Sequence, residues 1–245
     1  MKKIILILII FMILYNIFKK LCRCENFNNS KNILPYALFI NIKKRTDRLK
    51  NVHIQMKNWP EEKLIRIDAE KRRDGVLGCG LSHIKALEKA KKIIEENNLD
   101  YILILEDDFK WKFDFNITTD KLTEVFNSKI DWDVITLITS VFYGAKVEKT
   151  ENILRKVSNT GSTAGYIIKK NYIDKLLNLW KETMEVRKTR NFNKKWTAVN
   201  TNIDQAWKKL QKKDNWIIFN ENLGYQEPGF SDIENRNVDY LWCLN

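Results

Sequence analysis

Short apolar runs recur along the chain from residue 35 onward, and segments whose apolar residues are spaced three or four positions apart lie between several of them. A short, continuous apolar run is typical of a buried strand, whereas the wider spacing is typical of a helix with one buried face. The predicted strands are Ala37–Ile42, Leu64–Ile67, Tyr101–Leu105, Val134–Ile138, Ala164–Ile168 and Trp216–Phe219. Strands that alternate with helices predict an α/β domain whose mixed, mainly parallel sheet carries helices on both faces.

The clearest helical pattern begins near Ser82, a residue type that suits the cap position at a helix N-terminus. Its apolar face carries Ile84, Leu87, Ala90, Ile93 and Ile94. Shorter helices are predicted over Asn171–Trp180 and Ile203–Leu210. The segment Arg187–Lys195 lacks apolar periodicity, so we predict a basic loop there.

The N-terminal segment has a different pattern. Ile4–Phe18 contains one strongly polar side chain, Asn16, and lies between two pairs of lysines. As a helix it would be roughly 22 Å long against a hydrocarbon core of about 30 Å, a gap that lysines reaching to the interface can close. We predict an uncleaved signal anchor and its flanks over 1–24, a linker over 25–34 and one domain over 35–245. A cleavable signal peptide is the alternative, although no small-residue cleavage site follows.

The anchor predicts a single-pass membrane protein that contacts the bilayer through residues 4–18. Its domain would lie in the lumen of the ER or Golgi, or at a membrane face if the source is neither a eukaryote nor a virus. Two Asn-x-Ser/Thr sequences, at Asn28 and Asn116, fit a lumenal domain.

The net charge is +12, and five of these units come from basic residues within 1–24. The excess therefore flanks the apolar segment in part, and we expect no nucleic-acid partner. The remaining charge favours anionic ligands such as a nucleotide diphosphate or a lipid surface. Cys22, Cys24, Cys79 and Cys243 lack the paired spacing of a structural zinc site, and both four free thiols and two disulfides stay open.

Three adjacent acids, Glu106, Asp107 and Asp108, follow the predicted strand Tyr101–Leu105 directly. Ligands of open α/β sheets collect at the carboxyl ends of strands, and adjacent carboxylates repel one another unless a cation is present. A cation that prefers oxygen ligands, Mn²⁺ or Mg²⁺, would relieve this repulsion. The alternative is a solvated acidic turn.

Two glycines, Gly78 and Gly80, precede the predicted start of the helix at Ser82, where backbone N–H groups can meet a phosphate. A simple turn is the alternative. His83, which follows, is either a structural hydrogen-bonding residue or part of a site.

Two further acids are candidates for a general base. Asp204 opens the predicted helix Ile203–Leu210, where it could instead stabilise the first turn. Asp232 follows Pro228-Gly229-Phe230-Ser231, and a loop cap is its alternative role.

Six motifs in this order resemble glycosyltransferase family 25: Phe39-Ile40-Asn41-Ile42 with Arg45 and Arg48, Gly78-Cys79-Gly80-Leu81-Ser82-His83, Leu105-Glu106-Asp107-Asp108, Ala164-Gly165-Tyr166, Asp204-Gln205 and Ser231-Asp232-Ile233. The resemblance implies a Rossmann-type, GT-A-like fold, Mn²⁺ dependence, inversion at the anomeric carbon and a UDP-sugar donor, most often UDP-galactose. It implies that Glu106, Asp107 and Asp108 bind the metal and donor, and that the Asn41–Arg48 region lies against the nucleotide. His83 and Asp204 would lie near the reacting groups.

We therefore expect an inverting hexosyltransferase whose acceptor is a hydroxyl group of a glycan, glycoprotein or glycolipid, as in lipopolysaccharide biosynthesis. We expect Gly78, Gly80 and Ser82 to contact the donor. Two other functions compete: a metal-dependent phosphoesterase or nuclease, since clustered acids serve that chemistry too, and a non-catalytic, membrane-anchored basic module that binds anionic surfaces.

Overall fold

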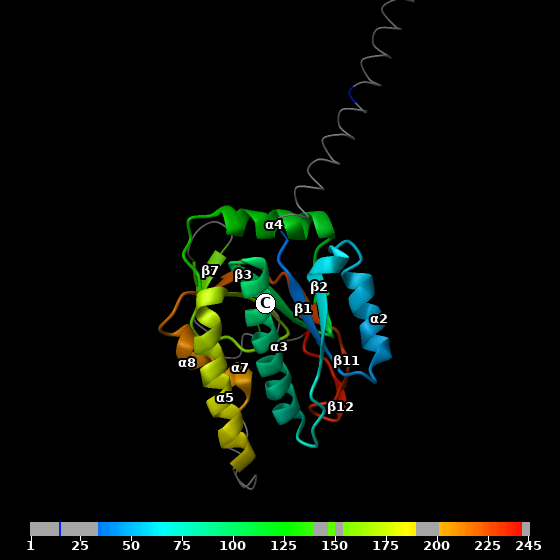
Figure 1. Cartoon of the computed structure of the whole chain (residues 1–245). Helices are drawn as coiled ribbons and strands as arrows, with labels where there is room; N and C mark the ends of the chain where they lie inside the picture. Colours follow the sequence, from blue (N-terminus) through cyan, green and yellow to red (C-terminus); the bar gives the residue numbers. More distant parts are fainter. Residues whose placement is uncertain (1–14, 16–33, 140–146, 150–153, 190–200, 242–245) are drawn as a thin grey trace, which may run out of the picture.

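The computed structural model describes Tyr15 and residues 34–139, 147–149, 154–189 and 201–241 (Figure 1). An eight-stranded sheet has the order β2-β1-β3-β8-β5-β9-β7-β6. Its strands are β1 (Ala37–Asn41), β2 (Leu64–Asp68), β3 (Tyr101–Glu106), β5 (Val134–Thr136), β6 (Val147–Lys149), β7 (Leu154–Val157), β8 (Gly165–Lys169) and β9 (Trp216–Phe219). All six predicted strands are present, with ends shifted by up to two residues.

The sheet is mixed, as predicted, but it is not mainly parallel. The pairs β1–β2, β1–β3 and β5–β9 are parallel, while β3–β8, β5–β8, β7–β9 and β6–β7 are antiparallel. An apolar run has the same composition in either direction, so the sequence pattern did not reveal that β8 runs against both of its neighbours. This reversal brings the start of β8 to the carboxyl end of β3, where Leu105 pairs with Gly165.

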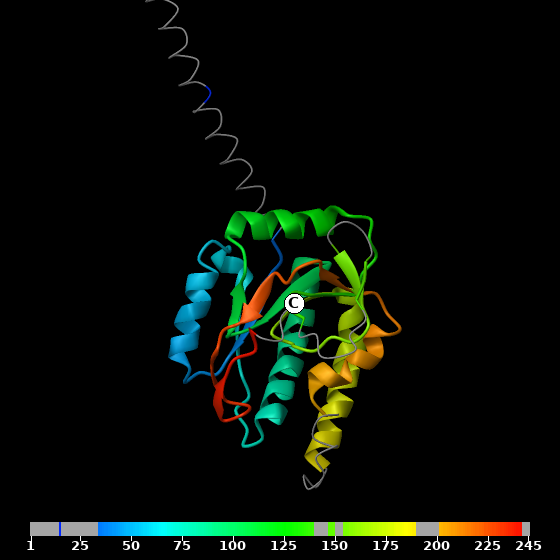
Figure 2. The same cartoon turned by 180° about the vertical axis from the view of Figure 1, so that it is seen from behind.

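Helices cover both faces of the sheet, which confirms that part of the prediction. Alternate residues of β1 point to opposite sides, so Leu38 lies in one apolar cluster and Phe39 in the other. The first cluster contains the buried faces of α3 (Gly75–Asn97) and α5 (Ile173–Thr189), which run side by side in Figures 1 and 2. The second contains residues of α2 (Thr46–Gln55) and α4 (Phe115–Asn127). Short 3₁₀ turns lie at Glu61–Lys63 and Lys170–Tyr172.

The long helix α3 begins seven residues before the predicted start at Ser82, so that prediction is wrong. Asp74 is the actual cap, and its carboxylate accepts hydrogen bonds from the backbone N–H groups of Val76 and Leu77. The apolar face predicted for this helix is buried. Ser82 lies inside the helix, where its hydroxyl donates to the Gly78 carbonyl and accepts from the Glu70 N–H group.

Two other helical predictions change in extent. Helix α5 continues to Thr189, so the first residues of the predicted basic loop Arg187–Lys195 are helical, and residues 190–195 lie outside the described part of the chain. The predicted helix Ile203–Leu210 is instead two short helices, α7 (Ile203–Ala206) and α8 (Lys208–Gln211).

Two small, two-stranded antiparallel sheets extend the fold beyond the carboxyl ends of β1 and β3. Strand β4 (Phe109–Trp111) pairs with β10 (Gly224–Gln226), and β11 (Gly229–Ser231) pairs with β12 (Arg236–Val238). The hairpin β11–β12 lies beside β1 and β2 in Figures 1 and 2. The C-terminal part of the chain thereby reaches the acids that follow β3.

The prediction of a single-pass membrane protein is contradicted. Among the residues that the structure describes, no helix is long and apolar enough to cross a bilayer. The predicted anchor segment 4–18 and the linker 25–34 lie almost wholly outside the described residues, apart from Tyr15 and Leu34.

Candidate active site

A pocket of about 640 Å³, including its open mouth, lies where β1, β2 and β3 end. The carboxyl ends of these parallel strands meet at one edge of the sheet, and the first turns of α3 form the opposite wall. The sequence-predicted residues that line it are Arg48, Gly78, Ser82, His83, Glu106, Asp107 and Asp232. Asn41, Arg45, Gly80, Asp108 and Asp204 are outside this lining.

The carboxylate of Glu106 is held by hydrogen bonds from two sides. Its Oε1 atom accepts from the Thr163 hydroxyl at 2.8 Å and lies 3.1 Å from His83 Nε2. Burial raises the pKa of Glu106, but the contacts with His83 and Thr163 outweigh burial and lower the pKa overall. Glu106 is thus an ionised, oriented carboxylate on the pocket wall.

Asp107 is buried and fully engaged by neighbouring side chains. Its Oδ2 atom accepts from Asn41 Nδ2 at 2.7 Å, and its Oδ1 atom accepts from Arg48 Nη1 at 2.8 Å. Burial raises the pKa of Asp107, and Arg48 opposes the rise.

Asp108 has one oxygen that is paired and one that is not. Arg48 Nη1 donates to Oδ2 at 3.0 Å, whereas Oδ1 is buried and accepts no hydrogen bond of normal geometry within the described residues. Burial and the neighbouring Glu106 raise the pKa of Asp108 to about 7, against the effect of Arg48 and of the Gln226 side chain. A cation beside Oδ1 would relieve this unfavourable burial of a carboxylate.

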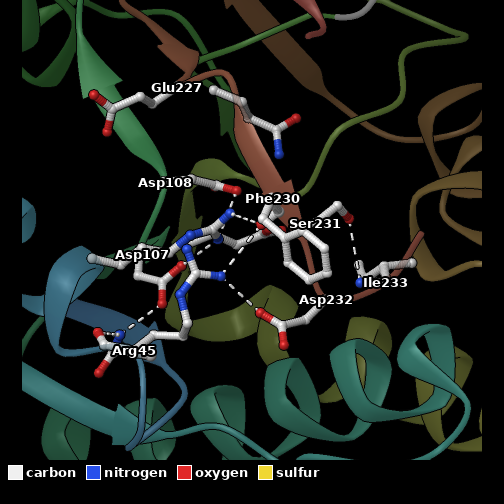
Figure 3. A network of polar contacts seen from close by, with 12 residues as sticks. Arg45, Asp107, Asp108, Glu227, Phe230, Ser231, Asp232 and Ile233 are labelled. Carbon is white, nitrogen blue, oxygen red and sulfur yellow. Dashed lines mark hydrogen bonds and ion pairs between the residues drawn. The ribbon is translucent and has the colours of Figure 1, made fainter. Parts of the chain in front are cut away.

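Arg48 therefore bridges two of the three acids. One guanidinium nitrogen contacts Asp107 and Asp108, and Nη2 donates to the Phe230 carbonyl at 2.9 Å. Figure 3 shows the two aspartates on the same side of this network, with Phe230 and Asp232 across from them.

Asp232 belongs to an ion-pair cluster at the mouth of the pocket. Arg45 Nη1 donates to its Oδ2 atom at 2.8 Å (Figure 3), and Lys71 Nζ donates to Oδ1 at 3.2 Å. Burial raises the pKa of Asp232, but the two cations outweigh burial and lower it. Arg45 also contacts Asp47, so its guanidinium ties α2 to the C-terminal hairpin.

Asp204 lies in the first turn of α7, as predicted. Its Oδ2 atom accepts from the Ser162 N–H group at 3.4 Å and from Gln205 Nε2 at 3.1 Å. Burial raises its pKa, and the charge of Glu106 adds to the rise. The two carboxylates are therefore close enough to interact electrostatically, although Asp204 is outside the lining of the pocket.

His83 is buried, and both ring nitrogens have partners. Nδ1 lies 3.2 Å from the Tyr166 hydroxyl and Nε2 contacts Glu106. The ring also packs against Trp180, with the ring centroids 5.6 Å apart. These contacts orient Glu106.

The predicted glycine loop before a helix N-terminus is wrong, because Gly78 and Gly80 lie within the first turns of α3. A Cβ atom on Gly78 would lie 2.5 Å from the Glu70 carbonyl oxygen, and one on Gly80 would collide with Met184 of α5. The two glycines are explained by the close approach of backbone and helix rather than by a phosphate-binding turn.

Several pocket residues were missed from the sequence. Lys71 and Arg72 line the pocket, and Thr163, which is outside the lining, contacts Glu106. The basic run that begins at Lys71 follows the predicted strand Leu64–Ile67, so the strand-end rule applied to the acids could have identified it. No sequence signal pairs Thr163 with Glu106, because this contact depends on the antiparallel direction of β8.

A family comparison identifies the class of protein. The family described as "Glycosyltransferase family 25 (LPS biosynthesis protein)" matches residues 19–190, so the chain belongs to glycosyltransferase family 25 and is a glycosyltransferase. Asp204 and Asp232 lie beyond the matched residues. No curated protein matches the chain.

Three solved structures match the chain at low identity and low TM-score. A glycosyltransferase involved in the glycosylation of the major capsid of PBCV-1 is 11% identical, with 75% of this chain and 91% of that chain covered and a TM-score of 0.40. A197 from STIV is 12% identical, with coverage of 84% and 93% and a TM-score of 0.44. The "mannose-1-phosphate geranyltransferase" from Thermus thermophilus is 10% identical, with coverage of 75% and 73% and a TM-score of 0.44.

Proposed function

We propose that this chain is an inverting, metal-dependent glycosyltransferase with a GT-A-like fold that moves a hexose to an acceptor hydroxyl. Galactose from UDP-galactose is the first candidate for the transferred sugar. The acceptor would be a glycan, glycoprotein or glycolipid. One observation carries the proposal: three adjacent acids, of which Asp107 is buried and the other two are partly buried, follow a strand at the edge of a pocket that basic side chains also line.

The basic residues supply the charge that a donor diphosphate needs. Arg48, Lys71 and Arg72 line the pocket, and cationic side chains pair with phosphate oxygens through charge-assisted hydrogen bonds. Asn41 and Arg45 are engaged with Asp107 and Asp232, so we propose that they position these carboxylates beside the nucleotide. Gly78 and Ser82 would contribute shape to the α3 wall.

The acid cluster fits a cation that prefers oxygen ligands, because the buried Oδ1 atom of Asp108 has no hydrogen-bond partner in the described part of the chain. We propose that Asp108 holds Mn²⁺ or Mg²⁺ with help from Glu106 and Asp107. When bound, such an ion supplies positive charge that stabilises the departing diphosphate.

Asp204 is the best-supported general base. A base works best when its pKa lies near the working pH, and burial raises the pKa of Asp204 toward that range. An inverting transfer needs one carboxylate that accepts the proton of the acceptor hydroxyl as the oxygen attacks the anomeric carbon. Asp232 is paired with two cations and His83 has partners on both nitrogens, so we assign positioning roles to both.

The proposal is tested with purified protein, Mn²⁺ and a panel of UDP-sugars, and UDP release is measured with and without simple glycan acceptors. We expect release with one UDP-hexose, and a loss of at least about 100-fold in Asp204→Asn, the usual scale for removal of a general base. Cleavage of phosphate esters without any dependence on the sugar would favour the phosphoesterase. Binding to anionic surfaces without turnover would favour the non-catalytic module.

A further inference from the structure

A second set of metal-binding side chains lies on the α3 wall of the same pocket. The potential ligand atoms of Cys79, His83 and Glu106 all lie within 4.8 Å of one another. Cys79 and His83 are four residues apart on α3, so both side chains project from the same face of the helix. Glu106 reaches them from the end of β3.

We propose that Cys79, His83 and Glu106 form a three-ligand site for a borderline-soft divalent ion, Zn²⁺ or Co²⁺, which shares Glu106 with the oxygen-ligand site proposed around Asp108. A thiolate, an imidazole and a carboxylate are the ligand types that zinc takes, and three protein ligands leave a fourth position open. All three residues line the pocket, so the open position can face solvent or a bound substrate.

The spacing of the ligands suits such an ion. Ligands of a tetrahedral zinc ion lie about 2.0–2.3 Å from the metal and hence roughly 3.3–3.8 Å apart. His83 Nε2 and Glu106 Oε1 are 3.1 Å apart, so the ion would take the place of the proton that these two atoms share. Only the Cys79 side chain has to close in, and its thiol proton is released to solvent when the thiolate binds.

His83 and Glu106 have the hydrogen-bond partners that usually orient metal ligands in proteins. The non-ligating nitrogen of a metal-bound histidine normally has a hydrogen-bond partner that fixes the ring, and His83 Nδ1 faces the Tyr166 hydroxyl at 3.2 Å. Glu106 Oε1 likewise accepts from Thr163 at 2.8 Å. His83 and Glu106 are therefore oriented before any ion binds.

The site is tested by Co²⁺ binding to the full chain in which Cys22, Cys24 and Cys243 are replaced by Ser, so that Cys79 is the one remaining thiol. Absorption spectroscopy then detects the sulfur-to-cobalt charge-transfer band and the visible bands of a four-coordinate cobalt ion. We expect one equivalent of Co²⁺ to bind with both signals and Zn²⁺ to displace it. His83→Gln and Glu106→Gln should each weaken binding by roughly tenfold or more.

His53→Gln is the matched control, since His53 is the other histidine of the chain and lies exposed on α2. This variant should bind Co²⁺ as the parent does. Absence of the charge-transfer band in the parent up to about 1 mM Co²⁺ would refute the site whatever the variants do. The site would also be refuted if cobalt bound with a thiolate signal and neither His83→Gln nor Glu106→Gln changed that binding. The readout is spectroscopic, so it is independent of whether the protein transfers a sugar.

Discussion

The ion pair between Arg187 and Asp74 joins the end of α5 to the cap of α3, and its removal should destabilise the fold strongly. Arg187 is 6% exposed and contacts the Asp74 carboxylate through two nitrogens, at 2.6 and 2.8 Å. A third nitrogen donates to the Thr201 hydroxyl at 2.9 Å. The substitution Arg187→Met retains most of the apolar stem and removes these contacts.

The expected loss follows from the burial of the pair. Removing one partner of a buried ion pair costs about 3–5 kcal/mol because the other charge stays buried. Asp74 is partly exposed and keeps its two backbone donors on α3, so we expect a smaller decrease in the free energy of unfolding, about 2–3 kcal/mol. The control is Lys181→Met, which removes an exposed pair with Glu88 between the same two helices and should cost at most about 1 kcal/mol.

Urea unfolding of both variants and the parent, followed by circular dichroism, measures these differences. The pKa of Asp74 is lowered in the fold: burial raises it, but Arg187 and the backbone donors outweigh burial. Stability from this group is present above the ordinary carboxyl pKa and is lost as the pH falls through the lower folded pKa. The difference in the free energy of unfolding between Arg187→Met and the parent should therefore become smaller at acid pH. Equal losses for Arg187→Met and Lys181→Met at neutral pH would refute the reasoning.

Three further predictions concern packing and the acid cluster. Gly80→Ala should lower the free energy of unfolding by about 1–3 kcal/mol because the added Cβ atom would collide with the buried Met184. The control Gly229→Ala should change this free energy little, since a Cβ atom there would have no atom within 4 Å. Urea unfolding measures both differences. In metal-free protein, Asp108→Asn should raise the melting temperature more at pH 8 than at pH 5. Because the pKa of Asp108 is raised to about 7 in the fold, its ionisation costs increasing stability as the pH rises from the unfolded pKa to about 7, and the substitution removes this cost. Arg48→Met leaves Asp107 and Asp108 without their shared cation, so Mn²⁺ should raise its melting temperature more than that of the parent; an equal or smaller rise would contradict this.

Local pattern predicted the strands and the acid cluster well, because both depend on residues adjacent in the chain. The run Tyr101–Leu105 forms β3, and the acids after it lie at the carboxyl edge of the sheet. The predicted start of α3 at Ser82 is wrong because a serine also suits a cap position, and the cap is Asp74. Asp74 also satisfies the cap rule and in addition pairs with Arg187, a contact that no local pattern contains.

The partners of the acids depend on topology and could not be predicted. Thr163 reaches Glu106 because β8 runs antiparallel to β3, and Arg48 reaches Asp107 and Asp108 from α2 across 59 and 60 positions of the chain. Two glycines in a row of candidate phosphate-binding residues were misinterpreted for a related reason. The small size of Gly78 allows close approach to the Glu70 backbone, and that of Gly80 allows close packing against Met184, which lies on a helix distant in the sequence.

If the acids after β3 serve a sugar-nucleotide donor, loss of one of them should slow transfer far more than loss of an acid outside the pocket. UDP release from the preferred UDP-hexose in the presence of Mn²⁺ is measured for Asp108→Asn and for Asp68→Asn. Asp68 ends strand β2 at the same edge of the sheet, but its carboxylate is exposed and paired with Arg66. The account predicts that Asp108→Asn loses at least about 100-fold in rate, the scale expected when a group that stabilises developing charge is removed, while Asp68→Asn stays within about twofold. Turnover by Asp108→Asn at the rate of the parent would contradict it.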